Sequence, residues 1–498
     1  MCKAISFILL VTNLAAQSSD YAGSDSCAQC HDNVGDYLQS QMARTSGPVT
    51  DLAKGESGNF HIDSNSMHFA RGDVKGRRRL DFFIGSGAAG HSYLFFQGGF
   101  LFQAPVSWFA KLNRWSASPG FAESEGLYLH RPIDVECLNC HASRLSPNAG
   151  TRNGFANPPF EEQGVACERC HGAAGEHVSS NGSARVVNPA KLTGRARDSV
   201  CAQCHLSGVE RVEKKKGAML AFRPGNDLAD FVTSFVWKAE AAPLKVNSHF
   251  EKLSQSKCRQ ASGDKLWCGT CHDPHRTVPD GERAAHYAAK CRTCHPQTHA
   301  KVAARDNCIG CHMPTAEPSD VAHTVYTDHS IPKTPRKADS KDGSELVAFW
   351  GETPRPRELG LAWARIANAR SDKALRERAY QLLREAVTQQ QGDAEVLTQL
   401  GWLLDQAGTS ERAIELYEQA LKQDPAQTLA AINLGALIAA KDMPRAVTLW
   451  RDALKRDPAS AEAAMNLARA LRKSGDEAGA KAVIDGLREF RPDFQPAF

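Results

Sequence analysis

Seven segments of the chain have the pattern Cys-x-x-Cys-His, and we number them motifs 1 to 7 in chain order. They run over residues 27–31, 137–141, 167–171, 201–205, 268–272, 291–295 and 308–312. Two thiols at this spacing can each form a thioether with one of the two vinyl groups on one edge of a haem, and the next His then faces the iron. The pattern therefore predicts seven covalently attached c-type haems.

Each motif assigns its residues to two roles. The expected thioether cysteines are Cys27, Cys30, Cys137, Cys140, Cys167, Cys170, Cys201, Cys204, Cys268, Cys271, Cys291, Cys294, Cys308 and Cys311. The expected proximal iron ligands are His31, His141, His171, His205, His272, His295 and His312. Zinc knuckles would pair two Cys-x-x-Cys units for each metal, and a thioredoxin-like redox pair would occur once, so neither explains a His after every pair.

Two cysteines are left over. Cys2 belongs to an N-terminal segment discussed below. Cys258 lies ten residues before Cys268 and is open to three interpretations: a packed thiol, a distal thiolate ligand, or a relic of another attachment site. Packing is the simplest of these, because free Cys is among the most buried residue types.

The motifs require elements that can carry them. They span residues 27–312, which is one motif for every 41 residues. At this density we expect the porphyrins to form the core, with short helices and irregular loops around them. Between motifs 1 and 2, the aromatic segment 79–109 with Gly98-Gly99 predicts a β-hairpin that covers the haems.

The C-terminal third has a different pattern. Residues 331–357 are rich in Pro and charged residues and predict a linker. Beyond it, alanines recur at positions 379, 413, 446 and 480, with spacings of 34, 33 and 34. This period is typical of tetratricopeptide units, and it predicts four antiparallel helix pairs. The expected fold is mainly α: a haem-cored domain over 17–330, then an α-solenoid over 358–498.

Stacked helix pairs of this kind leave a concave groove that commonly binds a peptide or a protein. We expect the groove to dock a redox partner protein. A rigid stalk without a ligand is the alternative.

The N-terminus predicts export. Residues 1–16 contain Lys3, a short apolar run and small residues at Ala15-Ala16, as in a secretory signal. No stretch reaches the roughly 18 apolar residues of a spanning helix, so a periplasmic or otherwise exported protein that does not span a membrane is expected. The 60 Lys and Arg against 56 Asp and Glu, a formal charge of +4, do not favour a nucleic-acid binder.

Eleven histidines lie outside the motifs, which is enough for bis-histidine ligation of seven irons. His275 is only three residues beyond His272, so it cannot reach the opposite face of the same haem and must serve a neighbour or none. The same argument applies to His299 after His295 and to His177 after His171. His323 and His329 follow the last motif and must reach back to earlier ones.

The chain resembles the exported multihaem cytochromes c with a C-terminal tetratricopeptide array. Its motif-bearing part is similar to the tetrahaem cytochromes of nitrifying bacteria and, more distantly, to octahaem hydroxylamine oxidoreductase. The resemblance covers nearly the whole chain and rests on Gly85-Ser-Gly, His91-Ser-Tyr-Leu, Pro105-Val-Ser-Trp108, Ser118-Pro-Gly-Phe121, Arg131-Pro-Ile, Cys268 to His275, Cys308 to Pro314 and Thr327-Asp-His329.

This resemblance implies a set of distal ligands. They are His91, His177, His249, His275, His299, His323 and His329, with His61, His68, His130 and His286 as a second tier. Relatives often place a His in a Ser-x-His segment after the first motif, where this chain has Ser40-Gln41-Met42. Met42 would raise the potential of the first haem. If Met42 does not ligate, one iron is five-coordinate.

The expected function is electron transfer through closely packed, mostly bis-histidine haems outside the cytoplasm. The alternative is a reductase or oxidase of a small nitrogen or sulfur compound at one open iron, with catalytic groups among His61, His68, His130 and Tyr93. All seven motifs end in His, and none has the Lys that replaces it in pentahaem nitrite reductase. A third interpretation makes the array the active part and the haems a sensor.

Overall fold

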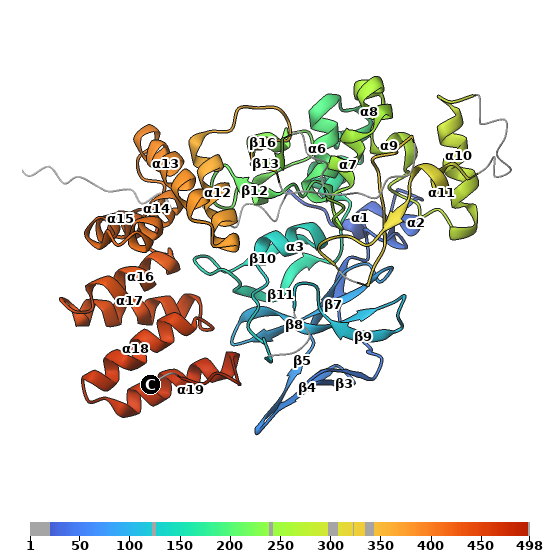
Figure 1. Cartoon of the computed structure of the whole chain (residues 1–498). Coiled ribbons are helices and arrows are strands. Elements are labelled where there is room, and N and C mark those ends of the chain that lie inside the picture. The colour runs from blue at the N-terminus through green and yellow to red at the C-terminus, as the bar shows by residue number, and fades with distance from the viewer. Residues whose placement is uncertain are drawn as a thin grey trace, which may run out of the picture.

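The structure is a computed structural model of the chain. It describes residues 20–121, 126–238, 243–296, 307–321, 323–333 and 343–496. The signal segment expected over 1–16 and the distal-ligand candidate His299 lie outside these ranges. Two larger β-sheets, three smaller sheets, a region of short helices and a long helical array make up the described chain (Figure 1).

The predicted hairpin is the centre of a five-stranded antiparallel sheet. Its order is β1 (Ser46–Pro48), β6 (Phe82–Ile84), β7 (Gly90–Gln97), β8 (Phe100–Phe109) and β9 (Arg114–Ala117). Gln97 pairs with Phe100, and both Gly98 and Gly99 have positive φ, which the tight turn requires. Side chains alternate between the faces: Phe95 and Phe102 join one apolar cluster, and Leu94 joins another.

A second sheet was not predicted. Residues 55–79 form a four-stranded meander of β2 (Gly55–Ser57), β3 (Phe60–Asp63), β4 (Ser66–Arg71) and β5 (Val74–Arg79). Its sequence signal is the alternation of buried Phe60 and Ile62 with exposed His61. The prediction of a single small hairpin therefore underestimated the amount of β-structure, although the chain as a whole is mainly α.

The motifs lie on or directly beside short helices. These helices are α1 (Ser24–Cys27), α3 (Val135–His141), α4 (Glu168–His171), α6 (Gly194–His205), α9 (Cys268–Cys271), α10 (Arg283–Arg292) and α11 (Cys308–His312). Between them run α2 (Val34–Leu38), α5 (Gly175–Ser179), α7 (His249–Gln255) and α8 (Lys257–Ser262). The short strands of this region are β10 (Ser143–Pro147), β11 (Phe155–Glu162), β12 (Glu210–Glu213), β13 (Val232–Trp237), β14 (Thr315–Ala316) and β15 (Tyr326–Thr327).

The C-terminal array consists of four helix pairs, as predicted. They are α12 (Pro356–Arg370) with α13 (Lys373–Gln389), α14 (Ala394–Gln406) with α15 (Ser410–Gln423), α16 (Thr428–Ile438) with α17 (Met443–Arg456), and α18 (Ala461–Lys473) with α19 (Glu477–Phe490). The periodic alanines are buried. Close helix contact also needs glycine: a Cβ on Gly401 would come 2.8 Å from the Tyr417 ring.

The region expected as a linker, 331–357, contains ordered structure. Residues 346–348 form strand β16 (Leu346–Ala348), which pairs with β13 in a three-stranded sheet of order β12-β13-β16. The following Phe349 and Trp350 pack on Phe250. The segment that enters the array is thus part of the fold of the motif-bearing region.

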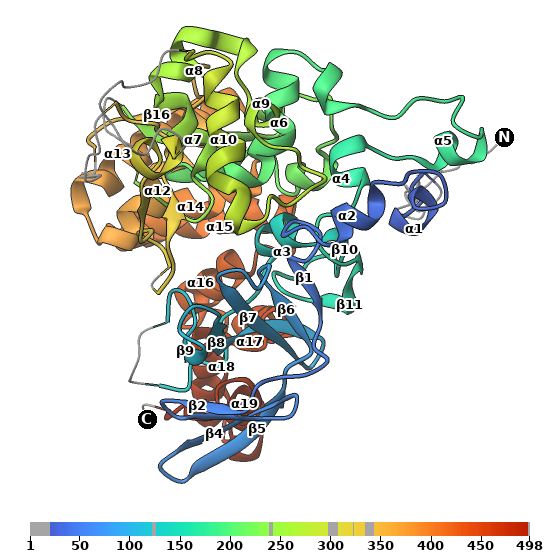
Figure 2. The same cartoon turned by 90° about the vertical axis from the view of Figure 1, so that its right-hand side faces the viewer.

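The array lies along one side of the motif-bearing part and touches it at several levels, as two perpendicular views show (Figures 1 and 2). Near its start, Arg357 donates to the Glu213 carbonyl oxygen at 2.6 Å. In the middle, Lys216 forms an ion pair with Asp424 at 2.9 Å. At its end, the Phe490 ring lies 5.9 Å from the Phe102 ring in the sheet.

Candidate haem-attachment sites

The region of motifs 5 to 7 has almost no side-chain core. Among the described residues between Phe250 and Leu346, Ala288 alone is a buried apolar residue. A chain of this length needs apolar surface removed from water in order to fold. Large apolar groups attached at the motifs would meet this need, so the residues present fit covalently bound haem.

Imidazoles from distant parts of the sequence face each other in pairs. The ring centroids of His31 and His177 are 6.3 Å apart, and their planes differ by 19°. The rings of His171 and His275 are 6.0 Å apart, also at 19°. Two imidazoles on opposite sides of one metal, each bonded at about 2 Å, would have centroids roughly 6 Å apart. Both pairs have the spacing of axial ligands.

A third pair has the same spacing. His272 of motif 5 lies 6.2 Å from His329, with planes at 34°. His205 of motif 4 lies closer to His249, at 5.1 Å, and the two planes are nearly perpendicular. In each of the four pairs, one ring belongs to a motif and the other lies outside it.

Hydrogen bonds fix the orientation of several of these rings through Nδ1. The acceptors are backbone carbonyl oxygens: Val187 for His171 at 2.8 Å, Ala184 for His177 at 2.7 Å, Thr327 for His329 at 3.0 Å and Pro332 for His312 at 3.0 Å. A proton held on Nδ1 leaves the lone pair on Nε2 available to a metal. Sequence reasoning could not find these acceptors, because any residue can supply a carbonyl.

Burial keeps the inner imidazoles neutral. Burial, and after it the nearby histidines, lower the pKa of His205 and that of His272 to about 4. Burial also lowers the pKa of His141 and His329. Neutral imidazole is the form that binds a metal.

The pairs of motifs 4 and 5 adjoin, because the His249 ring also lies 4.8 Å from the His329 ring. Within the described ranges, no group of three or more His, Cys, Asp or Glu side chains comes together as a potential metal-ion site. None of the 15 cysteines in those ranges forms a disulfide. Thiols of different motifs lie side by side: burial and then the neighbouring Cys167 raise the pKa of Cys27 to about 12. Cys258 is half-buried on α8, and its role stays open.

Hydrogen bonds of Thr45 connect the backbone of His141 with that of Gly85, which is close to His91. The Thr45 hydroxyl donates to the His141 carbonyl oxygen at 2.8 Å, and the Thr45 carbonyl accepts from the Gly85 amide at 2.7 Å. Gly85 is close to His91, since a Cβ on it would lie 3.7 Å from the His91 Cα. Burial lowers the pKa of His91. His323 is exposed, and its ring lies 5.5 Å from that of Phe109 in β8.

The second-tier histidines have other neighbours. His130 accepts a hydrogen bond from Arg491 of the array at 2.6 Å through Nε2. His61 and His68 are exposed on adjacent strands, with ring centroids 6.2 Å apart. His286 packs on Tyr287 at 5.1 Å, and the Tyr287 hydroxyl lies 3.2 Å from Nδ1 of His272.

Met42 is half-buried, and its carbonyl accepts from the Val165 amide at 3.0 Å. The ring opposite His31 belongs to His177.

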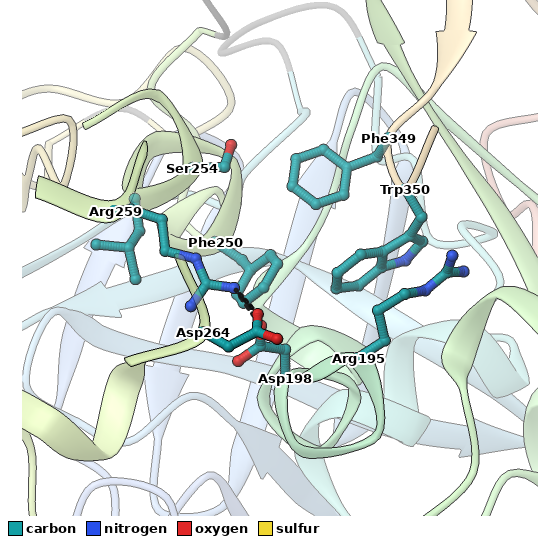
Figure 3. Close-up of a pocket in the computed structure, with 9 residues that line it drawn as sticks. Arg195, Asp198, Phe250, Ser254, Arg259, Asp264, Phe349 and Trp350 are labelled. Carbon is teal, nitrogen blue, oxygen red and sulfur yellow. Dashed lines mark hydrogen bonds and ion pairs between the residues drawn. The ribbon is translucent and has the colours of Figure 1, made fainter. Parts of the chain in front are cut away.

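A cavity of about 280 Å³ lies beside α6 and α7, close to motif 4 (Figure 3). Arg259 pairs with the buried Asp198 at 2.6 Å across it. Arg195 stacks on Trp350 at 5.4 Å and also pairs with Asp227. Burial raises the pKa of Asp198 even though Arg259 opposes the shift. The arginines of this cavity are thus paired with carboxylates, Arg259 with Asp198 across it and Arg195 with Asp227 outside its lining.

None of the helices within the described ranges is long and apolar enough to cross a membrane.

Comparisons with known proteins agree with both halves of this description. Residues 120–172 match the family model described as cytochrome c554 and c-prime. Residues 394–427 and 437–498 match two tetratricopeptide repeat models.

A curated relative is the protein named multiheme cytochrome MtrA from Shewanella baltica (strain OS185). It is 23% identical over 191 residues, which cover 35% of this chain and 56% of MtrA. The match thus spans little more than half the length of that relative.

Solved structures add little. The one titled "MamA RS-1 ArsTM double mutant" matches 29% of this chain and 79% of its own, at 19% identity and a TM-score of 0.25. The one titled "Crystal structure of MamA" matches 27% and 78%, at 16% identity and a TM-score of 0.24. Scores this low support no conclusion. The family matches, the MtrA similarity and the helix pairs together identify the chain as a multihaem c-type cytochrome with a C-terminal tetratricopeptide array.

Proposed function

We propose that the protein is a heptahaem cytochrome that carries electrons through closely packed, mostly bis-histidine haems. The observation that carries this proposal is the set of facing imidazoles, of which the His31 and His177 pair, 6.3 Å apart, is the first along the chain. When bound, haem supplies reversible one-electron chemistry at iron. The chain supplies ligands, spacing and exclusion of water.

We assign the axial ligands from the ring geometry. His177 serves motif 1, His275 serves motif 3, His249 serves motif 4 and His329 serves motif 5. His91 is assigned to motif 2, because Thr45 forms hydrogen bonds both with His141 and with Gly85, and Gly85 is close to His91. His299 and His323 remain the candidates for the other motifs. Each ligand taken from a different segment ties two segments together, which keeps neighbouring sites close.

Anchored Nδ1 atoms support low-spin ligation at these sites. Where a carbonyl holds the Nδ1 proton, as Val187 does for His171, the imidazole is a stronger and better oriented ligand. Burial of the inner rings, such as His205, also limits the water that could compete for iron. Such sites change little in geometry when they gain or lose an electron, which suits a carrier.

The array is assigned to partner binding. Tetratricopeptide pairs commonly bind peptides or proteins, and we propose that the groove docks a redox partner protein. The domain division proposed from the sequence is 17–330, 331–357 and 358–498, with β16 as an ordered part of the middle segment. Export to the periplasm after removal of residues 1–16 is part of the same proposal.

The test is electron paramagnetic resonance on the oxidised holoprotein, with mass spectrometry to count attached haems. Seven attached haems, all low-spin and inert to carbon monoxide after reduction, are expected. A high-spin haem that binds carbon monoxide would contradict the carrier assignment. It would favour the alternative, a reductase or oxidase of a small nitrogen or sulfur compound.

A further inference from the structure

The two variable residues of motif 3, Glu168 and Arg169, are unlike those of every other motif. The remaining pairs are Ala-Gln, Leu-Asn, Ala-Gln, Gly-Thr, Arg-Thr and Ile-Gly, so motif 3 alone carries a carboxylate. Charged side chains at these positions are not needed for thioether formation. Their partners in the structure show a different use.

Glu168 binds the segment that leads into motif 1. It is 5% exposed. Its Oε1 accepts from the Ala22 amide at 2.9 Å, and its Oε2 accepts from the Gly23 amide at 3.0 Å. Oε1 also accepts from the Ala174 amide at 2.7 Å, just after motif 3. A buried carboxylate is tolerated when backbone donors satisfy it in this way, and such charge-assisted hydrogen bonds are strong.

The contact between motifs 1 and 3 has a second part. The Cys167 amide of motif 3 lies 3.5 Å from the Ser24 hydroxyl at the start of α1. His177, six residues beyond motif 3, faces His31 of motif 1. Both the backbone before motif 1 and its facing imidazole therefore depend on motif 3.

Arg169 forms hydrogen bonds with motifs 2 and 4, one through its side chain and one through its backbone carbonyl. Its Nη2 donates to the carbonyl oxygen of Asn139, a variable residue of motif 2, at 2.7 Å. Its own carbonyl accepts from Nε2 of Gln203, a variable residue of motif 4, at 3.3 Å. Asn139 and Gln203 are 6% and 3% exposed. Hydrogen bonds between variable residues thus join motif 3 to motif 2 and to motif 4.

Glu168 and Arg169 consequently connect motif 3 to three other motifs, in addition to the His275 ring that follows motif 5 and faces His171. A linear row would provide only two neighbours. We infer that Glu168 and Arg169 are positioning residues that make motif 3 a branch point of the haem arrangement. The inference rests on the proposed function, because it concerns how that carrier spaces its cofactors. Neither side chain is assigned as a ligand of iron: Glu168 binds the backbone just before motif 1, and Arg169 binds the backbone of motif 2.

The test uses the full-length holoprotein and four variants. Glu168→Gln removes the charge that binds the Ala22 and Gly23 amides. Arg169→Ala removes the donor to the Asn139 carbonyl. Arg169→Lys keeps the positive charge but replaces the planar guanidinium by an ammonium group. Gln29→Ala, at an exposed variable position of motif 1, is the matched control.

The readouts are the number of attached haems, the electron paramagnetic resonance signals of magnetically coupled irons, and a redox titration. Arg169→Ala is expected to keep seven haems while the coupling signals change and at least two midpoint potentials move. Arg169→Lys should restore part of the wild-type pattern. Glu168→Gln should change the signals of fewer haems, and Gln29→Ala should change none.

The inference is wrong if Arg169→Ala and Glu168→Gln retain wild-type coupling and potentials at full haem content. If Arg169→Ala does not accumulate, Arg169→Lys and Glu168→Gln decide the question by the same criteria. Failure of the proposed function is separate: the wild-type protein would then lack seven reversibly reducible haems, whatever the variants did.

Discussion

The imidazole rings of His31 and His177 stack at 6.3 Å and 19° although 146 residues separate them in the chain. The nearer candidate, Met42, is only eleven positions from His31. The His177 ring is oriented by the Ala184 carbonyl, which accepts from Nδ1 at 2.7 Å. On this relationship rests our proposal that His177 is the distal ligand of the first haem.

His177→Ala should convert one haem to the high-spin state without loss of attached haem, because the thioethers of motif 1 do not depend on the distal ligand. Met42→Ala should leave all haems low-spin. Electron paramagnetic resonance of the oxidised variants measures both. A high-spin haem in Met42→Ala, with none in His177→Ala, would reverse the assignment.

His329→Ala should likewise produce one high-spin haem. Its ring faces His272 at 6.2 Å and is held by the Thr327 carbonyl at 3.0 Å. His68→Ala is the control, because His68 is exposed on strand β4. Optical spectra and haem counts of the two variants make the comparison. An unchanged spectrum for His329→Ala would remove this residue from the ligand set.

Cleavage of the chain between residues 334 and 342 should leave the two pieces associated and the haem spectrum intact. The C-terminal piece would keep β16, which pairs with β13, and Phe490, which packs against Phe100 and Phe102. Size-exclusion chromatography after cleavage at an inserted protease site tests this. Separate elution of the pieces would show that the array is held only by its covalent connection. Adding Phe490→Ala should weaken the association.

Arg357→Ala should lower the free energy of unfolding by about 3–5 kcal/mol. The Arg357 side chain is 8% exposed and pairs with Asp393 at 2.5 Å and with Glu395 at 3.1 Å. Its removal takes the paired cation from Asp393, whereas Glu395 keeps Arg365 at 3.1 Å. Lys216→Ala, which breaks the exposed bridge to Asp424, should cost no more than about 1 kcal/mol. Denaturant unfolding of both variants supplies the values. Equal losses would contradict the expected role of burial.

The contact between His130 and Arg491 should weaken in acid. Burial, and then the charge of Arg491, lower the pKa of His130 from 6.5 to about 4. Between these values the unfolded chain binds the proton more tightly than the folded chain, so stability is full above about pH 6.5 and falls as the pH drops toward 4. Because the His130 ring is partly exposed, we expect the free energy of unfolding to fall by about 1 kcal/mol at pH 5.

His130→Gln removes this titration, so the variant should lose less stability than the wild type between pH 7 and pH 5. Unfolding midpoints at the two pH values, with His61→Gln as the exposed control, measure the difference. Identical pH dependence of His130→Gln and wild type would show that another group dominates. The comparison is between variants, which cancels the common contribution of other histidines.

Features that depend on residues close together in the sequence could be predicted from the sequence alone. Cys27, Cys30 and His31 lie within about one helical turn, so their spacing alone assigns their chemistry. The alanines near position 413 recur because each helix pair repeats the same local packing, and four pairs followed from the period. The sequence also led us to expect that an imidazole from one segment would face a motif in another, since His275 cannot fold back onto the iron of its own motif, and the His275 ring does face that of His171.

The pairing of particular residues was not predictable. The meander over residues 55–79 was missed because its alternation is short and its apolar residues are few. The strand at 346–348 was concealed in a Pro-rich segment whose composition is typical of a linker, and only pairing with β13 makes it a strand. The contact of Phe490 with the sheet joins residues almost 400 positions apart.

The sequence by itself determined the cofactor class, the number of attachment motifs and the repeat architecture, because covalent attachment and helix-pair packing depend on short, fixed spacings. Only the tertiary structure decided which imidazoles face each other, that Glu168 and Arg169 join motif 3 to three others, and that the array packs along the sheets. Those contacts link segments distant in the chain. Their formation depends on the packing and hydrogen bonding of the whole fold, which no local pattern encodes.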